Sequence, residues 1–484
     1  MSLFIKKPLE QLLAQAEDSE KSLKRSLSAY NLVALGIGAI IGAGLFSITG
    51  VAAAANAGPA ITISFIVAAL GCAFAGLCYA EFASMIPVAG SAYTYSYATL
   101  GEFIAWIIGW DLVLEYALGA ATVAISWSRY LGKFLEHYDI YIPHYLAMSP
   151  YETATLADGT VVSGGINLPA VIIVMIISGI LIKGIQESAF VNAIIVMLKV
   201  TVVLIFIFLG WGYINPDNYV PYVPANNGTF GEFGFSGIIR AAGIVFFAYI
   251  GFDAVSTAAQ ESKNPKRDMP IGILGSLVVC TILYVLFAHV MTGLANYKEF
   301  AGQDGIAPVA VAISHTPYKF LQQAIILAIL AGYTSVILVM LMGQSRVFFS
   351  MSRDGLLPAF FSEVHSKFKT PYKSNILFMG FVGLFAGLVP ARVVGEMVSI
   401  GTLLAFVLVC IGVWVMRVKM PDAKREFKTP LVPLVPILGV IICMGMMLFL
   451  PGDTWLRLIA WMALGIVIYF AYSKKNSFLR KQKN

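Results

Sequence analysis

Lys199 is an ionisable residue deep inside an apolar stretch, where such residues commonly serve a function. It lies in the stretch 190–213, nine residues past Phe190, which corresponds to roughly 14 Å along a helix. A lysine at that depth cannot easily extend its ammonium to a membrane surface. We therefore expect one of two roles. Lys199 either gains and loses a proton, or it stays charged as a structural residue paired with a carboxylate or with carbonyls.

Asp111 and Glu115 form a second candidate group, because residues four apart share one face of a helix. Two like charges in apolar surroundings repel each other, so we expect at least one of them to be protonated or paired. Glu115 would then either approach the side chain or ammonium of a substrate, or make a buried polar contact between helices.

Two apolar stretches contain glycine where a helix would cross the middle of a membrane. The first has four glycines within 36–44, and the second has Gly251 within 246–253. Glycine costs about 1 kcal/mol in a helix interior, and backbone groups that face lipid must be paired. We therefore expect unwound backbone that lines a cavity at both places. The alternative for the first stretch is close helix packing, because Gly38 and Gly42 have the GxxxG spacing.

Such breaks offer backbone groups that can bind a carboxylate and an ammonium. Backbone N–H groups at the start of a helix carry the positive end of its dipole and suit a carboxylate. We assign this role to the N–H groups of Gly42, Ala43, Gly44 and Leu45. The carbonyls freed at the end of a half-helix suit an ammonium. Since the backbone would recognise only these two charged groups, the pocket walls would decide which substrate side chain is preferred.

The composition indicates which class of protein positions these groups. Hydrophobic residues make up 59% of the 484 residues and charged residues 12%, against about 45–50% and about 25% in ordinary soluble domains. This excludes a soluble enzyme, a nucleic-acid-binding protein and a disordered chain. About 20 apolar residues suffice to cross a bilayer as a helix. We predict twelve such spans, near 30–50, 60–84, 102–128, 168–186, 190–213, 235–258, 270–294, 320–350, 375–390, 395–417, 432–450 and 454–473.

The distribution of lysine and arginine predicts the orientation of the spans. If the N-terminus is cytoplasmic, 24 of the 32 basic residues fall on the inner side and six on the outer side. This bias favours a cytoplasmic location for both termini. The breaks lie in spans one and six, five spans apart, so the two interrupted helices run in opposite directions. Interrupted spans at matching positions of inverted halves are typical of a transporter binding site, and we predict an inverted repeat of spans 1–5 and 6–10.

No motif for catalysis or for a cofactor accompanies these features. The sequence has no Walker-type phosphate loop, no nucleophile motif and no His/Cys/Asp ligand cluster. The five cysteines all lie in apolar stretches, as core residues do. We therefore predict a protein that is not an enzyme, needs no cofactor or metal and binds no nucleic acid. Its energy would come from an ion gradient or from exchange.

Four segments of the sequence carry a family resemblance. They are LGIGAIIGAGLFSITG (35–50), YAEFASMIPVAGSAYTYSY (79–97), FFAYIGFDAVSTAAQESKNPKRDMPIG (246–272) and SRDGLLP (352–358). With them the chain resembles the amino acid–polyamine–organocation (APC) superfamily of permeases, and it is most similar to the bacterial branch related to cationic amino acid transporters. The resemblance covers about residues 25–420. It implies the LeuT-type five-plus-five fold, amino acid substrates and secondary transport.

The resemblance also assigns roles to individual residues. It implies that the freed carbonyls belong to Ile40, Ile41, Phe247, Ala248 and Ile250. It implies that Lys199 occupies the place where sodium-coupled relatives bind a cation, so that its ammonium could couple transport to protons. Related permeases often have Gly-Ser/Thr-Gly where this chain has Gly42-Ala43-Gly44, which removes one hydroxyl near the substrate. Phe252 either lines the pocket, with Tyr249, or simply packs in the core.

Together these features predict an all-α membrane protein that imports L-amino acids by proton symport with alternating access. The alternatives are an exchanger or uniporter with a structural Lys199, and an amino acid sensor that does not transport. The sequence does not decide between neutral, branched-chain and cationic amino acids as the preferred substrates. The expected partners are an amino acid, protons and the lipid bilayer of a plasma membrane, here a bacterial inner membrane. The expected organisation is a cytoplasmic segment 1–29, a transporter core 30–417, two further helices in 418–473 and a cytoplasmic tail 474–484.

Overall fold

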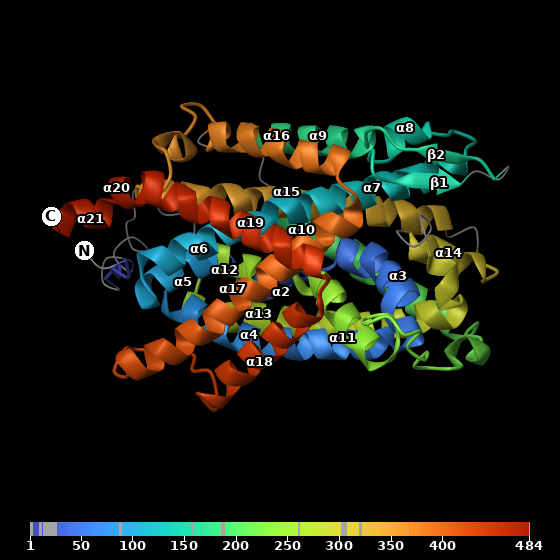
Figure 1. The fold of residues 1–484 in the computed structure, drawn as a ribbon, viewed down its shortest axis with the longest axis horizontal. Coiled ribbons are helices and arrows are strands. Elements are labelled where there is room, and N and C mark those ends of the chain that lie inside the picture. Colours follow the sequence, from blue (N-terminus) through green and yellow to red (C-terminus); the bar gives the residue numbers. More distant parts are fainter. Residues whose placement is uncertain are drawn as a thin grey trace.

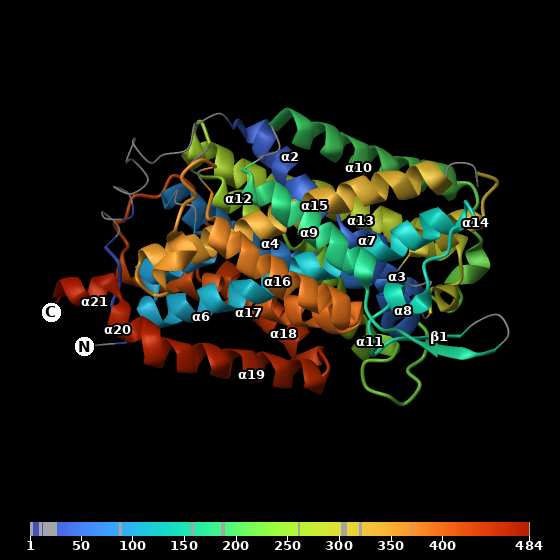
Figure 2. The ribbon, with the colours of Figure 1, turned by 90° about the horizontal axis from the view of Figure 1, so that it is seen from above.

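Long helices run side by side through the molecule, roughly along the horizontal axis of Figures 1 and 2. The structure is a computed structural model that describes residues 3–8, 12, 27–86, 90–155, 159–184, 189–259, 262–301, 307–318, 322–368 and 370–483. Both chain termini are marked at the left of each view, so they share one end of the bundle. We call this end the termini end and the opposite one the hairpin end.

The first half of the chain begins with an interrupted helix. α2 (Ala29–Ile40) ends at a break, and the helix resumes as the π-helical turn η1 (Gly44–Ile48), α3 (Thr49–Ala52) and η2 (Ala53–Ala57). The elements that follow are η3 (Gly58–Ala60), α4 (Ile61–Met85), α5 (Ser91–Thr99), α6 (Glu102–Val113), η4 (Leu114–Leu118), α7 (Gly119–Glu136), α8 (His144–Ala147), α9 (Leu168–Ile182) and α10 (Ala189–Trp211).

A second interrupted helix follows in the middle of the chain. After η5 (Pro216–Tyr219), α11 (Gly234–Val245) continues as η6 (Phe246–Tyr249), and a break separates η6 from α12 (Ala254–Thr257). The later elements are α13 (Pro265–Leu294), η8 (Tyr297–Phe300), α14 (Pro308–Ser314), α15 (Gln322–Arg353), η11 (Ala359–Ser362), α16 (Tyr372–Leu388), α17 (Ala391–Lys419), α18 (Leu434–Phe449), α19 (Gly452–Ile468), η12 (Tyr469–Ser473), α20 (Lys474–Asn476) and α21 (Phe478–Lys483).

A short hairpin lies at the hairpin end. β1 (Thr153–Thr155) pairs antiparallel with β2 (Val161–Ser163), and Thr153 lies opposite Ser163. The Arg129 guanidinium near the end of α7 forms an ion pair with Glu152, with 3.1 Å between Nη2 and Oε1. This ion pair ties the hairpin to α7.

The lengths and the apolar composition of the helices bear on the predicted number of spans. Among the described residues, eight helical stretches are long and apolar enough to cross a membrane, and three shorter apolar helices accompany them. The stretch Ala29–Met85 is one of the eight and contains two of the predicted spans. These eight to eleven helices agree with a multi-pass membrane protein but do not confirm twelve spans.

The two interrupted helices are enclosed by other helices. α2 packs against α10, α13 and α15, and α11 packs against α4 and α18. The five cysteines are free and buried, in agreement with the predicted core role. The bundle therefore places its two backbone irregularities away from the surface.

Candidate substrate site at two helix breaks

The first break follows Ile40. Ile41 is extended, with φ −71° and ψ 104°, which ends α2, and the helix resumes at Gly44. The N–H of Leu45 donates to the carbonyl of Gly42 at 3.2 Å. The predicted break is therefore present. In this conformation one of the proposed carboxylate donors, the Leu45 N–H, is engaged within the chain.

The second break lies at Ile250 and Gly251. Ile250 is extended, with φ −60° and ψ 135°, and Gly251 has a φ of +116°. A Cβ on residue 251 would lie 2.9 Å from both the carbonyl carbon and the oxygen of Ala39. Glycine is required here for two reasons, because the backbone is left-handed and because α2 approaches it closely. The break occurs where the sequence predicts it.

The two breaks contact each other. A Cβ on Gly44 would lie 2.2 Å from Cα of Ala248, so the backbones of η1 and η6 touch at this position. Gly42 has a different environment, in which an added Cβ would lie 3.2 Å from a methyl group of Val336. The glycine at position 44 thus allows direct contact between the two irregular segments.

Tyr284 joins the two breaks. Its hydroxyl lies 2.8 Å from the carbonyl oxygen of Ile40 and 2.9 Å from that of Ala248, so its single proton can be donated to either carbonyl or shared between them. Tyr284 belongs to α13 and is fully buried. Sequence reasoning did not find this residue. The available signal was a tyrosine inside an apolar helix, since a buried tyrosine hydroxyl usually has a partner.

Hydroxyl groups also hold the second half of the first helix. The Tyr130 hydroxyl of α7 donates to the carbonyl of Phe46 at 2.5 Å. The hydroxyls of Ser47 and Tyr333 lie 2.9 Å apart, which connects η1 to α15. The breaks are therefore fixed by polar contacts to three surrounding helices, α7, α13 and α15.

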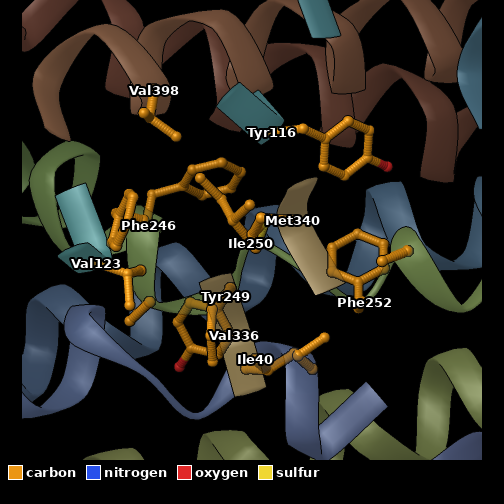
Figure 3. Packing of buried hydrophobic residues seen from close by; sticks show 14 of the residues in the cluster. Ile40, Tyr116, Val123, Phe246, Tyr249, Ile250, Phe252, Val336, Met340 and Val398 are labelled. Carbon is orange, nitrogen blue, oxygen red and sulfur yellow. The ribbon is translucent and has the colours of Figure 1, made fainter. Parts of the chain in front are cut away.

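Apolar side chains surround the breaks. Figure 3 shows part of this buried cluster, including Ile40, Phe246, Tyr249, Ile250, Val336 and Met340. The predicted site residues in both breaks are buried in the same way. In this conformation the protein encloses the breaks.

Phe252 and Tyr249 have packing roles in this conformation. The Phe252 ring lies edge-on to Tyr79, with 5.7 Å between ring centroids, and 5.0 Å from the Phe406 ring. The Tyr249 hydroxyl donates to the carbonyl of Phe65 in α4 at 3.2 Å. For Phe252 this contact corresponds to the second of its two expected roles, packing in the core.

Lys199 connects three helices. Its side chain is 1% exposed, and Nζ donates to the carbonyl of Gly38 at 2.7 Å. That carbonyl belongs to the last turn of α2, where carbonyls lack partners within the helix. A Cβ on Gly332 in α15 would lie 2.9 Å from Cε of Lys199, so the lysine stem packs directly on α15. The hydrogen bond of the Lys199 ammonium therefore depends on where the broken end of α2 lies.

Three buried carboxyl groups lie near the second break. Glu115, in the π-helical turn η4, adjoins Asp253 and Asp111. The Tyr116 hydroxyl donates to Asp253 at 2.5 Å. The three carboxyl-bearing side chains are at most 1% exposed. Within the described part of the chain, no ion pair includes any of them.

Partly buried ion pairs lie at the termini end. Glu81 of α4 accepts two hydrogen bonds from Arg417 of α17, each 2.8 Å long. Lys7 forms a 2.7 Å ion pair with Asp354 at the end of α15. These contacts connect helices that surround the two breaks.

A further ion pair involves the last described helix. Glu102, which is fully buried, accepts from Nε of Arg480 at 2.6 Å and from the hydroxyls of Tyr97 and Tyr469, each at 2.9 Å. Because Arg480 belongs to α21, the C-terminal segment contributes to the buried contacts at this end.

Comparisons with known proteins identify relatives of this chain. The profile of a family described as "Amino acid permease" matches residues 27–469. The chain is 48% identical over 480 residues to the "Branched-chain amino acid permease BcaP" of Bacillus subtilis (strain 168), which covers 99% of each chain. It is 45% identical over 480 residues to the "Methylthioribose transporter" of the same organism, covering 99% of this chain and 100% of the relative. The "Cationic amino acid transporter 4, vacuolar" of Arabidopsis thaliana is 36% identical over 432 residues, or 87% of this chain and 68% of the relative.

Proposed function

This chain belongs to the amino acid permease (APC) family, and on that premise we propose that it imports L-amino acids across a bacterial plasma membrane as a secondary active transporter. The family membership makes it a multi-pass membrane protein and a transporter, not an enzyme. The proposed mechanism is alternating access, in which the two breaks are exposed to one side of the membrane at a time. The proposed substrates are neutral amino acids with small or branched side chains.

The observation that carries the proposal is the pair of carbonyls next to the Tyr284 hydroxyl. An ammonium has three N–H donors and suits the carbonyls of Ile40 and Ala248. The N–H groups at the start of η1 suit the carboxylate of the same substrate. We assign substrate binding to Ile40, Ile41, Gly42, Ala43, Gly44, Leu45, Phe247, Ala248 and Ile250, as in the sequence-based prediction.

The apolar cluster around the breaks supports the preference for neutral side chains. Val336 adjoins Gly42, and Phe246 and Met340 belong to the same cluster. The side chains of this cluster carry no charge. A cationic substrate side chain would need a counter-charge here, which the buried carboxyl groups near the second break would supply only when ionised. The relative named as a branched-chain amino acid permease agrees with this preference. Phe252 and Glu115 stay candidates for contact with a substrate side chain in other conformations.

We also propose the LeuT-type inverted repeat with twelve spans. The isolated bridge between Leu27 and Ser262 supports it, because it places the start of α2 beside the chain that follows α12. The two interrupted helices therefore run in opposite directions, as an inverted repeat requires. In this proposal both termini are cytoplasmic, 30–417 form the transporter core, 418–473 supply two further helices, and 1–29 and 474–484 flank them.

Lys199 is our proposed site of proton coupling. Its ammonium donates to the carbonyl of Gly38 in the broken end of α2, so a change in its charge would alter how α2 is held. The alternative proton carrier is the neighbouring pair Glu115 and Asp253. Two adjacent buried carboxyl groups without a cationic partner repel each other when both are ionised, which favours retention of a proton.

The test is uptake by purified protein in liposomes. We expect an inward proton gradient to drive accumulation of labelled alanine, valine, leucine or isoleucine, and we expect little uptake of lysine or arginine. Lys199→Met should abolish this accumulation while substrate-dependent thermal stabilisation persists. If Lys199→Met accumulates substrate at the parental rate, Lys199 does not carry the proton, and Glu115 with Asp253 becomes the proposed carrier. Failure of every amino acid to bind or move would contradict the proposed function.

Methylthioribose is a second candidate substrate. The relative named for it is 45% identical and aligns over its full length, close to the identity of the branched-chain relative. Methylthioribose has neither an ammonium nor a carboxylate, so its hydroxyls would have to bind the same carbonyls. Unlabelled methylthioribose that competes with labelled leucine would favour this candidate.

A further inference from the structure

A groove outside the proposed substrate site opens at the termini end. It lies between the start of α13 and the segment that joins α17 to α18, and its volume is about 670 Å³. Its polar side is formed by Lys266, Arg267 and Glu426, and its apolar side by Ile271, Leu274 and Phe427. Since α13 is a membrane-crossing helix by length and composition, a groove at its first turns lies where lipid headgroups meet the apolar layer.

The polar side of the groove has an excess of positive charge. Glu426 accepts from Lys266 at 3.2 Å and lies 3.5 Å from Nζ of Lys424. The hydrogen bond from Lys266 lowers the pKa of the Glu426 carboxyl from its ordinary value, so this residue is ionised. Arg267 is exposed and has no ion pair among the described residues. Two lining cations, Lys266 and Arg267, thus face one lining carboxylate. Neither Lys424 nor Asp268, which is buried, lines the groove.

An apolar strip continues from the groove along the bundle. On α13, Ile271, Val278 and Ile282 are 41%, 60% and 56% exposed, and their spacing places them along one side of the helix. The neighbouring helix α4, which packs against α13, exposes Ile66 and Leu70 by 46% and 47%. A ligand with a long hydrocarbon chain can therefore extend from the charged groove onto this strip.

We propose that the groove binds one anionic phospholipid, with its phosphate beside Arg267 and Lys266 and its acyl chains along α13 and α4. Arginine suits this ligand, because its guanidinium donates two parallel hydrogen bonds to phosphate oxygens. Basic groups at a membrane surface attract anionic headgroups. Free phosphate would satisfy the charges but would leave the apolar strip unused.

The experiment compares the full-length protein with the double variant Lys266→Gln/Arg267→Gln. Both substituted side chains are exposed, so the fold should tolerate their replacement. The matched control is Lys475→Gln/Lys481→Gln, which removes the same two charges from exposed positions at the same end, outside the groove. Native mass spectrometry counts phosphatidylglycerol molecules that stay bound in detergent. Thermal unfolding measures stabilisation by phosphatidylglycerol, by phosphatidylcholine with the same acyl chains, by glycerol phosphate and by inorganic phosphate.

We expect the parent and the control to retain phosphatidylglycerol and to be stabilised by it. The groove variant should bind it about tenfold more weakly or worse, since two phosphate-facing charges are lost. Equal retention by the groove variant would overturn the proposal. So would equal stabilisation by phosphatidylcholine, which would mean that the headgroup charge is irrelevant. Stabilisation by inorganic phosphate as large as that by phosphatidylglycerol would assign the groove to a free anion and not to a lipid.

Discussion

Gly44 is a residue at which one added methyl group should weaken substrate binding. Its missing Cβ would overlap Cα of Ala248 at 2.2 Å. We expect Gly44→Ala to separate the two breaks and to weaken substrate binding by about tenfold or more, as overpacking of a close contact commonly costs 1–3 kcal/mol. The control is Gly42→Ala, which meets only a methyl group of Val336 at 3.2 Å. Substrate-dependent thermal stabilisation measures both, and equal binding by the two variants would contradict the role of the contact.

Tyr284 provides a second prediction for a single residue. Replacing it with phenylalanine removes the donor to the carbonyls of Ile40 and Ala248. We expect Tyr284→Phe to lower the free energy of unfolding of the substrate-free protein by about 1–3 kcal/mol, the cost of leaving buried acceptors unpaired. Tyr249→Phe removes a donor to one carbonyl at 3.2 Å and should cost less. Denaturant unfolding in detergent compares them, and the prediction fails if Tyr249→Phe is the more damaging change.

Among the elements, α10, α15 and α2 meet at Lys199, and this junction can be disturbed without changing any charge. A Cβ on Gly332 would lie 2.9 Å from Cε and 3.1 Å from Cγ of Lys199. We expect Gly332→Ala to displace the ammonium from the carbonyl of Gly38 and to reduce proton-driven uptake by about tenfold, because a lost charged hydrogen bond costs about 1.5–3 kcal/mol. Substrate binding should change little.

Gly380→Ala on the neighbouring helix α16 is the control for Gly332→Ala, because a Cβ on Gly380 has no neighbour within 4 Å. Its uptake should equal that of the parent. Uptake by Gly332→Ala at the parental level would mean that the position of the ammonium relative to α2 does not matter for transport.

The same elements show which parts of the site sequence reasoning can reach. The two breaks were predictable because glycine weakens a helix locally, and Ile41 and Ile250 are extended where the glycines suggested. The position of Lys199 in the middle of α10 was predictable from the apolar stretch that surrounds it. The Tyr284 contacts were not, because they join α13 to carbonyls 244 and 36 residues away in the chain. Sequence spacing within one helix carries no information about such partners.

Across the whole molecule, the ion pairs at the termini end should contribute to stability. Arg480→Gln would leave the buried Glu102 with hydroxyl donors but without a cation. Because breaking a buried ion pair from one side commonly costs about 3–5 kcal/mol, we expect a clear fall in melting temperature. The exposed neighbour Lys475→Gln is the control and should melt with the parent.

The double variant Glu102→Gln/Arg480→Gln separates charge from packing. With no uncompensated charge left, it should recover much of the stability that Arg480→Gln loses. A double variant as unstable as the single one would mean that the shape of the arginine, and not its charge, holds α21 in place.

The contact between Glu102 and Arg480 also constrains the order in which the protein can be completed during synthesis. Its two partners are 378 residues apart in the chain, and ribosomes add about 5–20 residues per second. At these elongation rates, Arg480 is synthesised roughly 20–80 s after Glu102. For most of that interval only Tyr97, among the side chains that donate to Glu102, has been made, because Tyr469 and Ser477 shortly precede Arg480 in the chain. The packing around the start of α6 can be finished only after residue 480 has left the ribosome, and a nascent chain that stalls before residue 480 keeps a carboxylate without its cation there.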